Sequence, residues 1–214
     1  MVTGIVLAGG RATRFGADKL LAPLDGRPLL HHAILAVASV SDEVMVVIGA
    51  DGARPRLPVD AATRVRVVRD SVADGGPLAG LAAGLAAARG RLAILVGGDQ
   101  PWLLPSILAE IVLWLDSAVD GRQLDAVALA EDGAIRPLPA ALRVATVRPV
   151  VETLLAGSSR SLLGLLERLR VGTLEPERWR LLDPEGASLR DVDTPDALPH
   201  PDRGPAAPRP PGTV

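Results

Sequence analysis

The sequence predicts a single α/β domain in which helices cover both faces of a parallel sheet. The chain has 214 residues, enough for one such domain with a sizeable core, and 48% of them are hydrophobic. Short, continuous apolar runs alternate with longer stretches in which apolar residues recur at helical spacing. Strands that are apolar throughout are typical of a parallel sheet buried on both sides.

The first 130 residues repeat this alternation. Pro28 and Pro77 stand at the starts of two helical stretches, where the missing backbone N–H breaks no helical hydrogen bond. The pattern predicts helices at residues 28–40, 77–89 and 104–115, and strands at residues 3–8, 44–48, 65–68, 92–96 and 126–130.

After residue 130 the alternation weakens. Pro137 and Pro139 exclude a helix, so residues 135–144 are expected to be extended. Helices are expected at residues 147–156 and 161–169. Residues 199–214 are rich in Pro and nearly free of bulky apolar side chains. We therefore divide the chain into a folded domain, residues 1–198, and a disordered tail, residues 199–214.

Composition excludes several classes of function. The formal net charge of −2 argues against a nucleic-acid-binding protein, which needs a basic face. The absence of Cys excludes disulfides, zinc ribbons, iron–sulfur clusters and cysteine nucleophiles. The apolar runs are shorter than the roughly 18 residues of a membrane span, and no basic segment precedes the first run. We expect a cytoplasmic protein with no membrane partner.

The first candidate site is the glycine-rich loop after the first strand. Gly9 and Gly10 end that strand, and Arg14 and Lys19 follow. Ligands of open α/β sheets bind at the carboxyl ends of strands, and glycines let backbone N–H groups approach phosphate oxygens. Lys19 is the only Lys among 23 basic residues, which suggests a role that Arg cannot fill. The alternative is a tight turn that carries solvated arginines.

Three further segments follow predicted strands or precede helices. Asp70 follows the third strand, and a glycine pair at residues 75–76 then opens a helix. Asp99 follows the fourth strand and two glycines, a position that suits Mg²⁺ but also suits a helix N-cap. Asp191 and Asp193 would point to one side of an extended segment, or lie in a solvated turn.

These segments, in this order, resemble the molybdenum cofactor guanylyltransferase family, whose members belong to the nucleotidyltransferases that activate a phosphorylated molecule with a nucleoside triphosphate. The resemblance covers about residues 3–198. It is carried by Leu7-Ala8-Gly9-Gly10, Arg14, Gly16, Asp18-Lys19, Asp70-Ser71, Gly76-Pro77-Leu78-Ala79-Gly80, Asp99 with Pro101, and Asp193-Thr194-Pro195-Asp196.

The resemblance implies a three-layer α/β/α sandwich, a Rossmann-like nucleotidyltransferase fold with a mostly parallel mixed sheet. It implies that GMP is transferred from GTP to the phosphate of molybdopterin, with Mg²⁺ as cofactor and pyrophosphate as the leaving group. Other cofactor-biosynthesis proteins are candidate partners.

The resemblance also assigns roles to residues. Arg14, Lys19 and Asp99 would be catalytic, and Asp99 would hold Mg²⁺. Arg160, Asp191 and Asp193 would bind the acceptor. The nucleotide would be bound by Leu7, Ala8, Gly9, Gly10, Arg14, Lys19, Asp70, Gly76, Gly80 and Asp99.

The sequence departs from the family at three positions. Asp191 and Asp193 often stand as Asn in the family, and Gly49 replaces an Asn close to the nucleotide. An Asp cannot donate a hydrogen bond to a phosphate, so one of the two carboxylates would face the metal or the segment would contact donors on the pterin. A cytidylyltransferase for the same cofactor, or a nucleotidyltransferase for another phosphorylated metabolite, stays an alternative. A catalytically silent nucleotide-binding regulator is disfavoured by the presence of Arg14, Lys19 and Asp99.

Overall fold

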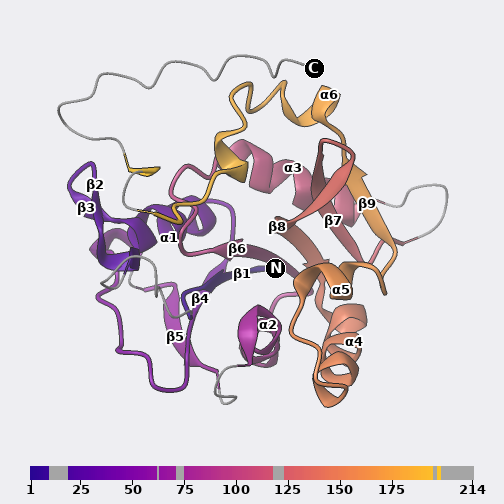
Figure 1. Ribbon diagram of the computed structural model, residues 1–214, viewed down its shortest axis with the longest axis horizontal. Coiled ribbons are helices and arrows are strands. Elements are labelled where there is room, and N and C mark those ends of the chain that lie inside the picture. The colour runs from indigo at the N-terminus through magenta and orange to yellow at the C-terminus, as the bar shows by residue number, and fades with distance from the viewer. Residues whose placement is uncertain (10–18, 62, 71–74, 118–122, 195–196, 199–214) are drawn as a thin grey trace.

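A seven-stranded sheet lies between two layers of helices in the computed structural model (Figure 1). The structure describes residues 1–9, 19–61, 63–70, 75–117, 123–194 and 197–198. The predicted tail, residues 199–214, therefore lies outside the described residues. The α/β/α sandwich expected from the sequence is confirmed.

The sheet is mostly parallel and mixed, as expected. Its strand order is β5-β4-β1-β6-β8-β7-β9. β8 pairs antiparallel with both β6 and β7, while the other pairings of this sheet are parallel. The strands are β1 (Val2–Leu7), β4 (Glu43–Ile48), β5 (Val65–Arg69), β6 (Leu92–Gly97), β7 (Ala126–Glu131), β8 (Ala134–Arg143) and β9 (Val171–Leu174).

The register brings three carboxyl ends together. Leu7 at the end of β1 is paired with Val47 of β4 on one side and with Gly97 of β6 on the other. Segments that follow these strands therefore meet at one edge of the sheet.

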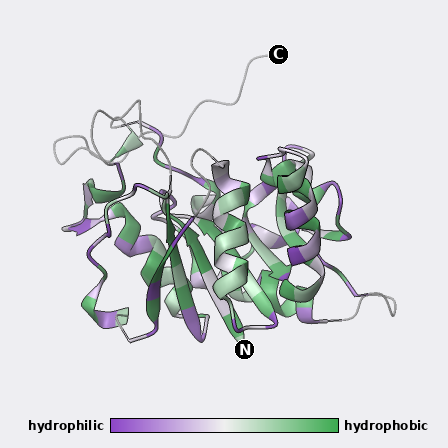
Figure 2. Cartoon of the chain, turned by 90° about the horizontal axis from the view of Figure 1, so that it is seen from below, coloured by the Kyte–Doolittle hydropathy of each residue, from purple (hydrophilic) through white to green (hydrophobic). Residues whose placement is uncertain are grey.

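Two apolar cores separate the sheet from its helical layers. On one face, Ile34, Val37, Ile107 and Ile111 pack with Trp179. They belong to α1 (Leu29–Ala38), α3 (Pro105–Asp116) and α6 (Pro176–Trp179). Figure 2 shows that the strands between the layers are mainly hydrophobic, while the helices carry hydrophilic residues as well.

The other face is covered by α2 (Gly76–Ala87), α4 (Val144–Ala156) and α5 (Leu162–Leu166). Gly84 lets α2 approach the sheet closely, because a Cβ there would collide with the side chain of Ile5 in β1. This approach places the N-terminus of α2 beside the carboxyl ends of the strands.

Several short elements complete the fold. A hairpin is formed by β2 (Pro23–Leu24) and β3 (Arg27–Pro28), and single turns of 3-10 helix are η1 (Lys19–Leu21), η2 (Val59–Ala61) and η3 (Ala187–Leu189). The sequence did not predict these elements, β9 or α6. No helix among the described residues is both long and apolar enough to span a bilayer.

Candidate active site

The ends of β1, β4 and β6 are joined by backbone hydrogen bonds that continue past the strands. The Ala8 N–H donates to the Val47 carbonyl at 2.7 Å, and the Gly98 N–H donates to the Leu7 carbonyl at 2.9 Å. These bonds fix the start of the segment after β1 against the segment after β6. Leu7 and Ala8 thus support the edge at which the sequence placed the nucleotide.

The backbones of Gly9 and Gly49 lie close together at this edge. A Cβ on Gly9 would lie 3.0 Å from the backbone nitrogen of Gly49, so a side chain there would crowd the backbone. A Cβ on Gly49 itself would meet no described atom within 4 Å. The missing side chain at Gly49 therefore leaves space beside the end of β1 that no described residue fills.

Lys19 joins the two predicted carboxylate segments. Its Nζ lies 2.7 Å from Asp99 Oδ2 and donates a hydrogen bond of 3.3 Å to Asp193 Oδ1. Asp99 is positioned by the turn after β6, and Lys19 by η1. Three residues from distant parts of the chain thus converge on one point.

Charges at this point alter two pKa values. Burial lowers the pKa of Lys19, but the hydrogen bonds and negative charges of Asp99 and Asp193 outweigh it and raise the pKa above its usual value. Burial raises the pKa of Asp191, and the charges of Asp193 and Asp99 raise it further. The region carries more negative than positive charge among the described side chains, so it favours an additional cation.

The carboxylate of Asp99 lies over the end of β6. A Cβ on Gly97 would collide with Asp99 Oδ1, so the glycine makes room for this carboxylate. The interpretation of Asp99 as a helix N-cap is wrong, because α3 begins at Pro105 and its N-cap residue is Leu104. Asp99 is therefore free of a capping role and is paired with Lys19.

The segment that carries Asp191 and Asp193 is anchored by the residue between them. The Val192 N–H donates to the Asp99 carbonyl at 3.0 Å. The Val192 side chain is fully buried with Leu24 and Leu29. Val192 points into this small core, whereas Asp193 reaches Lys19 and Asp191 experiences the charges of the neighbouring carboxylates.

Asp70, Gly76 and Gly80 lie at the same edge, next to β5 and α2. Asp70 is 8% exposed, and its N–H donates to the Ile48 carbonyl at 2.9 Å. Gly76 has φ +70°, a backbone conformation that favours glycine. A Cβ on Gly80 would lie 3.1 Å from the Leu7 side chain, so this glycine brings α2 close to the end of β1.

Arg160 lies beside α2. A Cβ on Gly76 would lie 3.1 Å from Arg160 Cβ. The family resemblance implied that Arg160, together with Asp191 and Asp193, binds the acceptor. In the structure Arg160 borders the glycine loop expected at the nucleotide, whereas Asp193 pairs with Lys19.

Two predicted site residues, Gly10 and Arg14, lie outside the described residues. Within the described part, no three or more His, Asp or Glu side chains cluster closely enough to hold a metal ion by themselves. Asp99 and Asp193 nevertheless fit Mg²⁺, because their oxygens already converge on a cation, the Lys19 ammonium. Mg²⁺ is commonly held by one or two carboxylates together with substrate phosphates and water.

Sequence reasoning missed the polar residues behind the turn that carries Asp99. Gln100, Asp183 and Ser188 are all buried and hydrogen-bonded there. Arg69 was also missed: its guanidinium donates to the carbonyls of Ala50 and Gly52 and so holds the loop after β4. These are ordinary polar residue types, and no motif in the sequence distinguishes them.

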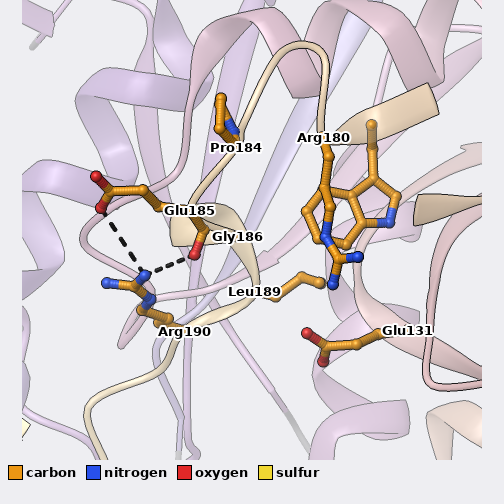
Figure 3. Close-up of a pocket in the computed structure, with 8 residues that line it drawn as sticks. Glu131, Arg180, Pro184, Glu185, Gly186, Leu189 and Arg190 are labelled. Carbon is orange, nitrogen blue, oxygen red and sulfur yellow. Dashed lines mark hydrogen bonds and ion pairs between the residues drawn. The ribbon is translucent and has the colours of Figure 1, made fainter. Parts of the chain in front are cut away.

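A pocket of about 240 Å³ lies beside η3, at the carboxyl end of β7 (Figure 3). Its walls include Glu131, Arg180 and Arg190, with Trp179 and Leu189 as apolar surface. The predicted site residues do not line it. Arg190 turns toward Glu185, and its NH2 donates to the Glu185 carbonyl at 2.6 Å.

Comparison with known proteins identifies the family of the chain. A family described as "MobA-like NTP transferase domain" matches residues 4–171. A probable molybdenum cofactor guanylyltransferase of Chloroflexus aggregans is 32% identical over 201 residues, 92% of each chain. A molybdenum cofactor guanylyltransferase of Burkholderia ambifaria is 38% identical over 169 residues, 74% of this chain and 78% of its own.

A solved structure has the same fold. Molybdopterin-guanine dinucleotide biosynthesis protein A from Archaeoglobus fulgidus superposes with a TM-score of 0.69 at 22% identity, covering 91% of this chain and 93% of its own.

Proposed function

Because the chain belongs to the MobA-like NTP transferase domain family and is a nucleotidyltransferase, we propose that it transfers GMP from GTP to the phosphate of molybdopterin. A phosphate oxygen of the acceptor attacks the α-phosphorus of GTP. The bond from that phosphorus to the pyrophosphate oxygen breaks, and pyrophosphate leaves. The reaction needs no side-chain nucleophile.

The convergence of Lys19, Asp99 and Asp193 carries this proposal. Nucleotidyl transfer depends chiefly on positioning the phosphates and neutralising their charge. The Lys19 ammonium sits at the edge where β1, β4 and β6 end, within reach of two carboxylates. In the complex it would exchange part of this pairing for phosphate oxygens, which form short, charge-assisted hydrogen bonds with an ammonium group.

Asp99 and Asp193 would hold Mg²⁺ there. When bound, the ion would neutralise charge on the triphosphate. Asp99 is the stronger candidate ligand, because the Val192 N–H fixes its backbone carbonyl and its side chain is less exposed than that of Asp193. Asp193 is two-thirds exposed and can turn toward either an ion or the acceptor.

The remaining predicted residues would surround the nucleotide. The open space beside Gly49 and the glycine-rich start of α2 provide room at the strand ends. Gly10 and Arg14 are proposed to contact the phosphates from the segment after β1. Asp70, Gly76 and Gly80 are proposed to contact base and ribose, and Asp191 the acceptor. Arg160, which borders Gly76, is proposed to contact the acceptor where it meets the nucleotide.

Release of pyrophosphate tests the proposal. Purified protein would be incubated with GTP, CTP or ATP, each with and without molybdopterin and with and without Mg²⁺. We expect release with GTP only when both molybdopterin and Mg²⁺ are present. A preference for CTP would instead identify a cytidylyltransferase, and no release with any nucleotide would contradict the proposal.

A further inference from the structure

A group of buried polar side chains lies directly behind the proposed cation site. Gln100 is 4% exposed, Asp183 2% and Ser188 0%. Their polar atoms are hydrogen-bonded to the local backbone, and the transfer reaction itself does not use them. Buried polar groups need hydrogen-bond partners, and these bonds constrain the segments that they join.

The first bonds shape η3. The Asp183 carboxylate accepts hydrogen bonds from the N–H groups of Ala187, at 2.9 Å, and Ser188, at 2.7 Å. On the outer side, Arg190 bonds to Glu185, as Figure 3 shows. The turn is thus stabilised by the Asp183 carboxylate on its buried side and by Arg190 on the side of the pocket.

The next bonds connect η3 to the turn after β6. The Ser188 hydroxyl accepts from the Leu104 N–H at 3.0 Å, and the Ser188 carbonyl accepts from Gln100 Nε2 at 3.4 Å. Gln100 Oε1 in turn accepts from the Gly97 N–H at 2.8 Å. Gln100 therefore bridges the last residue of β6 and the turn that leads to Asp191.

These bonds close a loop around Asp99. Asp99 lies between Gly97 and Gln100 in the chain, and its carbonyl accepts from Val192, a few residues beyond Ser188. The spacing between Asp99 and Asp193 is therefore set by two connections. One is the direct Val192 bond, and the other passes through Gln100 and Ser188.

We propose that Gln100 and Ser188 are positioning residues that hold Asp99 and Asp193 at the spacing a divalent cation requires. The inference rests on the proposed function insofar as it assigns these two carboxylates to the cation. Residues behind metal ligands typically affect metal affinity by about 10- to 100-fold. Gln100 and Ser188 occupy that place for both carboxylates at once.

The test uses Ser188→Ala, Gln100→Met and the double variant in the full chain. Gln100→Met keeps the length of the side chain but removes both hydrogen bonds. Ser41→Ala is the matched control, because Ser41 is also buried and its hydroxyl donates one bond, to the Val37 carbonyl, near the opposite edge of the sheet. Mn²⁺ serves as a paramagnetic probe of the cation site, and its affinity for nucleotide-free protein is measured by electron paramagnetic resonance.

Each single variant should weaken Mn²⁺ binding by about 10- to 100-fold. It should lower kcat for GMP transfer more than it raises the KM for GTP. The double variant should be worse than either single variant, because Ser188→Ala removes the bond from the Leu104 N–H, whereas Gln100→Met removes the bonds to Gly97 and to the Ser188 carbonyl. Ser41→Ala should lower the melting temperature without altering Mn²⁺ affinity.

Unchanged Mn²⁺ affinity in a folded single variant, or an absence of Mn²⁺ binding by the unaltered protein, would overturn the inference. If Ser188→Ala does not fold, Gln100→Met alone decides. Loss of Mn²⁺ affinity in the variants of a protein that transfers no GMP would support the inference while contradicting the proposed function.

Discussion

The backbone of Val192 is hydrogen-bonded to the backbone of Asp99, with 3.0 Å between the Val192 nitrogen and the Asp99 oxygen. This bond lays a late segment of the chain against the turn after β6. It sets Asp193 opposite Asp99, with the Lys19 ammonium between the two carboxylates.

Lys19→Ala should abolish most of the activity without unfolding the protein. The ammonium lies at the strand ends where the phosphates are proposed to bind, and loss of one such preorganised group typically costs about 10²- to 10³-fold in rate. Lys19→Arg should rescue only part of the loss, because the planar guanidinium does not match the point at which Asp99 and Asp193 converge. Turnover and melting temperature of both variants check this. Near-normal turnover in folded Lys19→Ala would show that Lys19 has no role in transfer.

Asp99→Asn separates the charge of this side chain from its shape. The variant keeps one side-chain oxygen but loses the negative charge that would hold Mg²⁺. Transfer should fall by orders of magnitude, and the Mg²⁺ concentration needed for half-maximal GTP binding should rise. Melting temperature should change little, because Asp99 is partly exposed and caps no helix. Full Mg²⁺-dependent activity in Asp99→Asn would refute the metal role.

Gly97→Ala should displace the Asp99 carboxylate while leaving the fold intact. The added Cβ would collide with Asp99 Oδ1, the end of a flexible side chain that can turn away. A misplacement of about 1 Å at a reacting site can cost about 10²-fold in rate. Gly157→Ala is the control, since a Cβ at Gly157 makes only ordinary contacts, the nearest at 3.5 Å. Equal turnover for the two variants would show that the position of Asp99 is unimportant.

The strands and most helices could be predicted because their signals are local. β1, β4, β6 and β7 each contain a continuous apolar run, α1 and α3 have apolar residues at helical spacing, and α2 is rich in Ala and Leu. Because ligands of open α/β sheets bind at the carboxyl ends of strands, the sequence also predicted Asp99 at the edge that carries Lys19. By contrast, β9 has four residues with a glycine among them, and α6 is a single turn. Elements this short are stabilised by their packing, which the local pattern does not encode.

The placement of Asp191 and Asp193 illustrates the same limit at the site. Two carboxylates at i and i+2 predict only a shared side of an extended segment. Their distance from Asp99 depends on burial of Val192 against Leu24 and Leu29, a contact between two distant parts of the chain. Likewise, Gln100 acquires its role only through Ser188, which the sequence does not mark.

Glu43→Gln should destabilise the fold in a pH-dependent way. Burial raises the pKa of Glu43, but hydrogen bonds from the Arg89 N–H, Thr3 and Arg66, with the charge of Arg66, outweigh it and lower the pKa below its usual value. The stabilisation is therefore present above the unfolded-state value and is lost as pH falls through the lowered value.

At pH 7 the variant should lose about 1–3 kcal/mol of unfolding free energy, the typical cost of disrupting buried hydrogen bonds to a charged group. In acid, the curves for the two proteins should converge. Urea unfolding across pH checks this, with Glu152→Gln on the exposed face of α4 as control. A difference that stays constant down to acid pH would contradict the assignment.

We expect that the chain can be shortened at its C-terminal end without loss of the fold. Residues 199–214 offer almost nothing apolar to bury, and their prolines lack backbone donors. Leu198, by contrast, packs partly buried against the small core of Leu24, Leu29 and Val192. Truncation after Leu198 should therefore leave melting temperature and GMP transfer nearly unchanged. Truncation after Thr194 removes this leucine, which should lower the free energy of unfolding by about 1 kcal/mol. It should also reduce transfer, because Leu198 packs against the core that holds Val192, and Val192 positions Asp193. A drop of several degrees for the longer product would show that residues beyond Leu198 contribute to the fold.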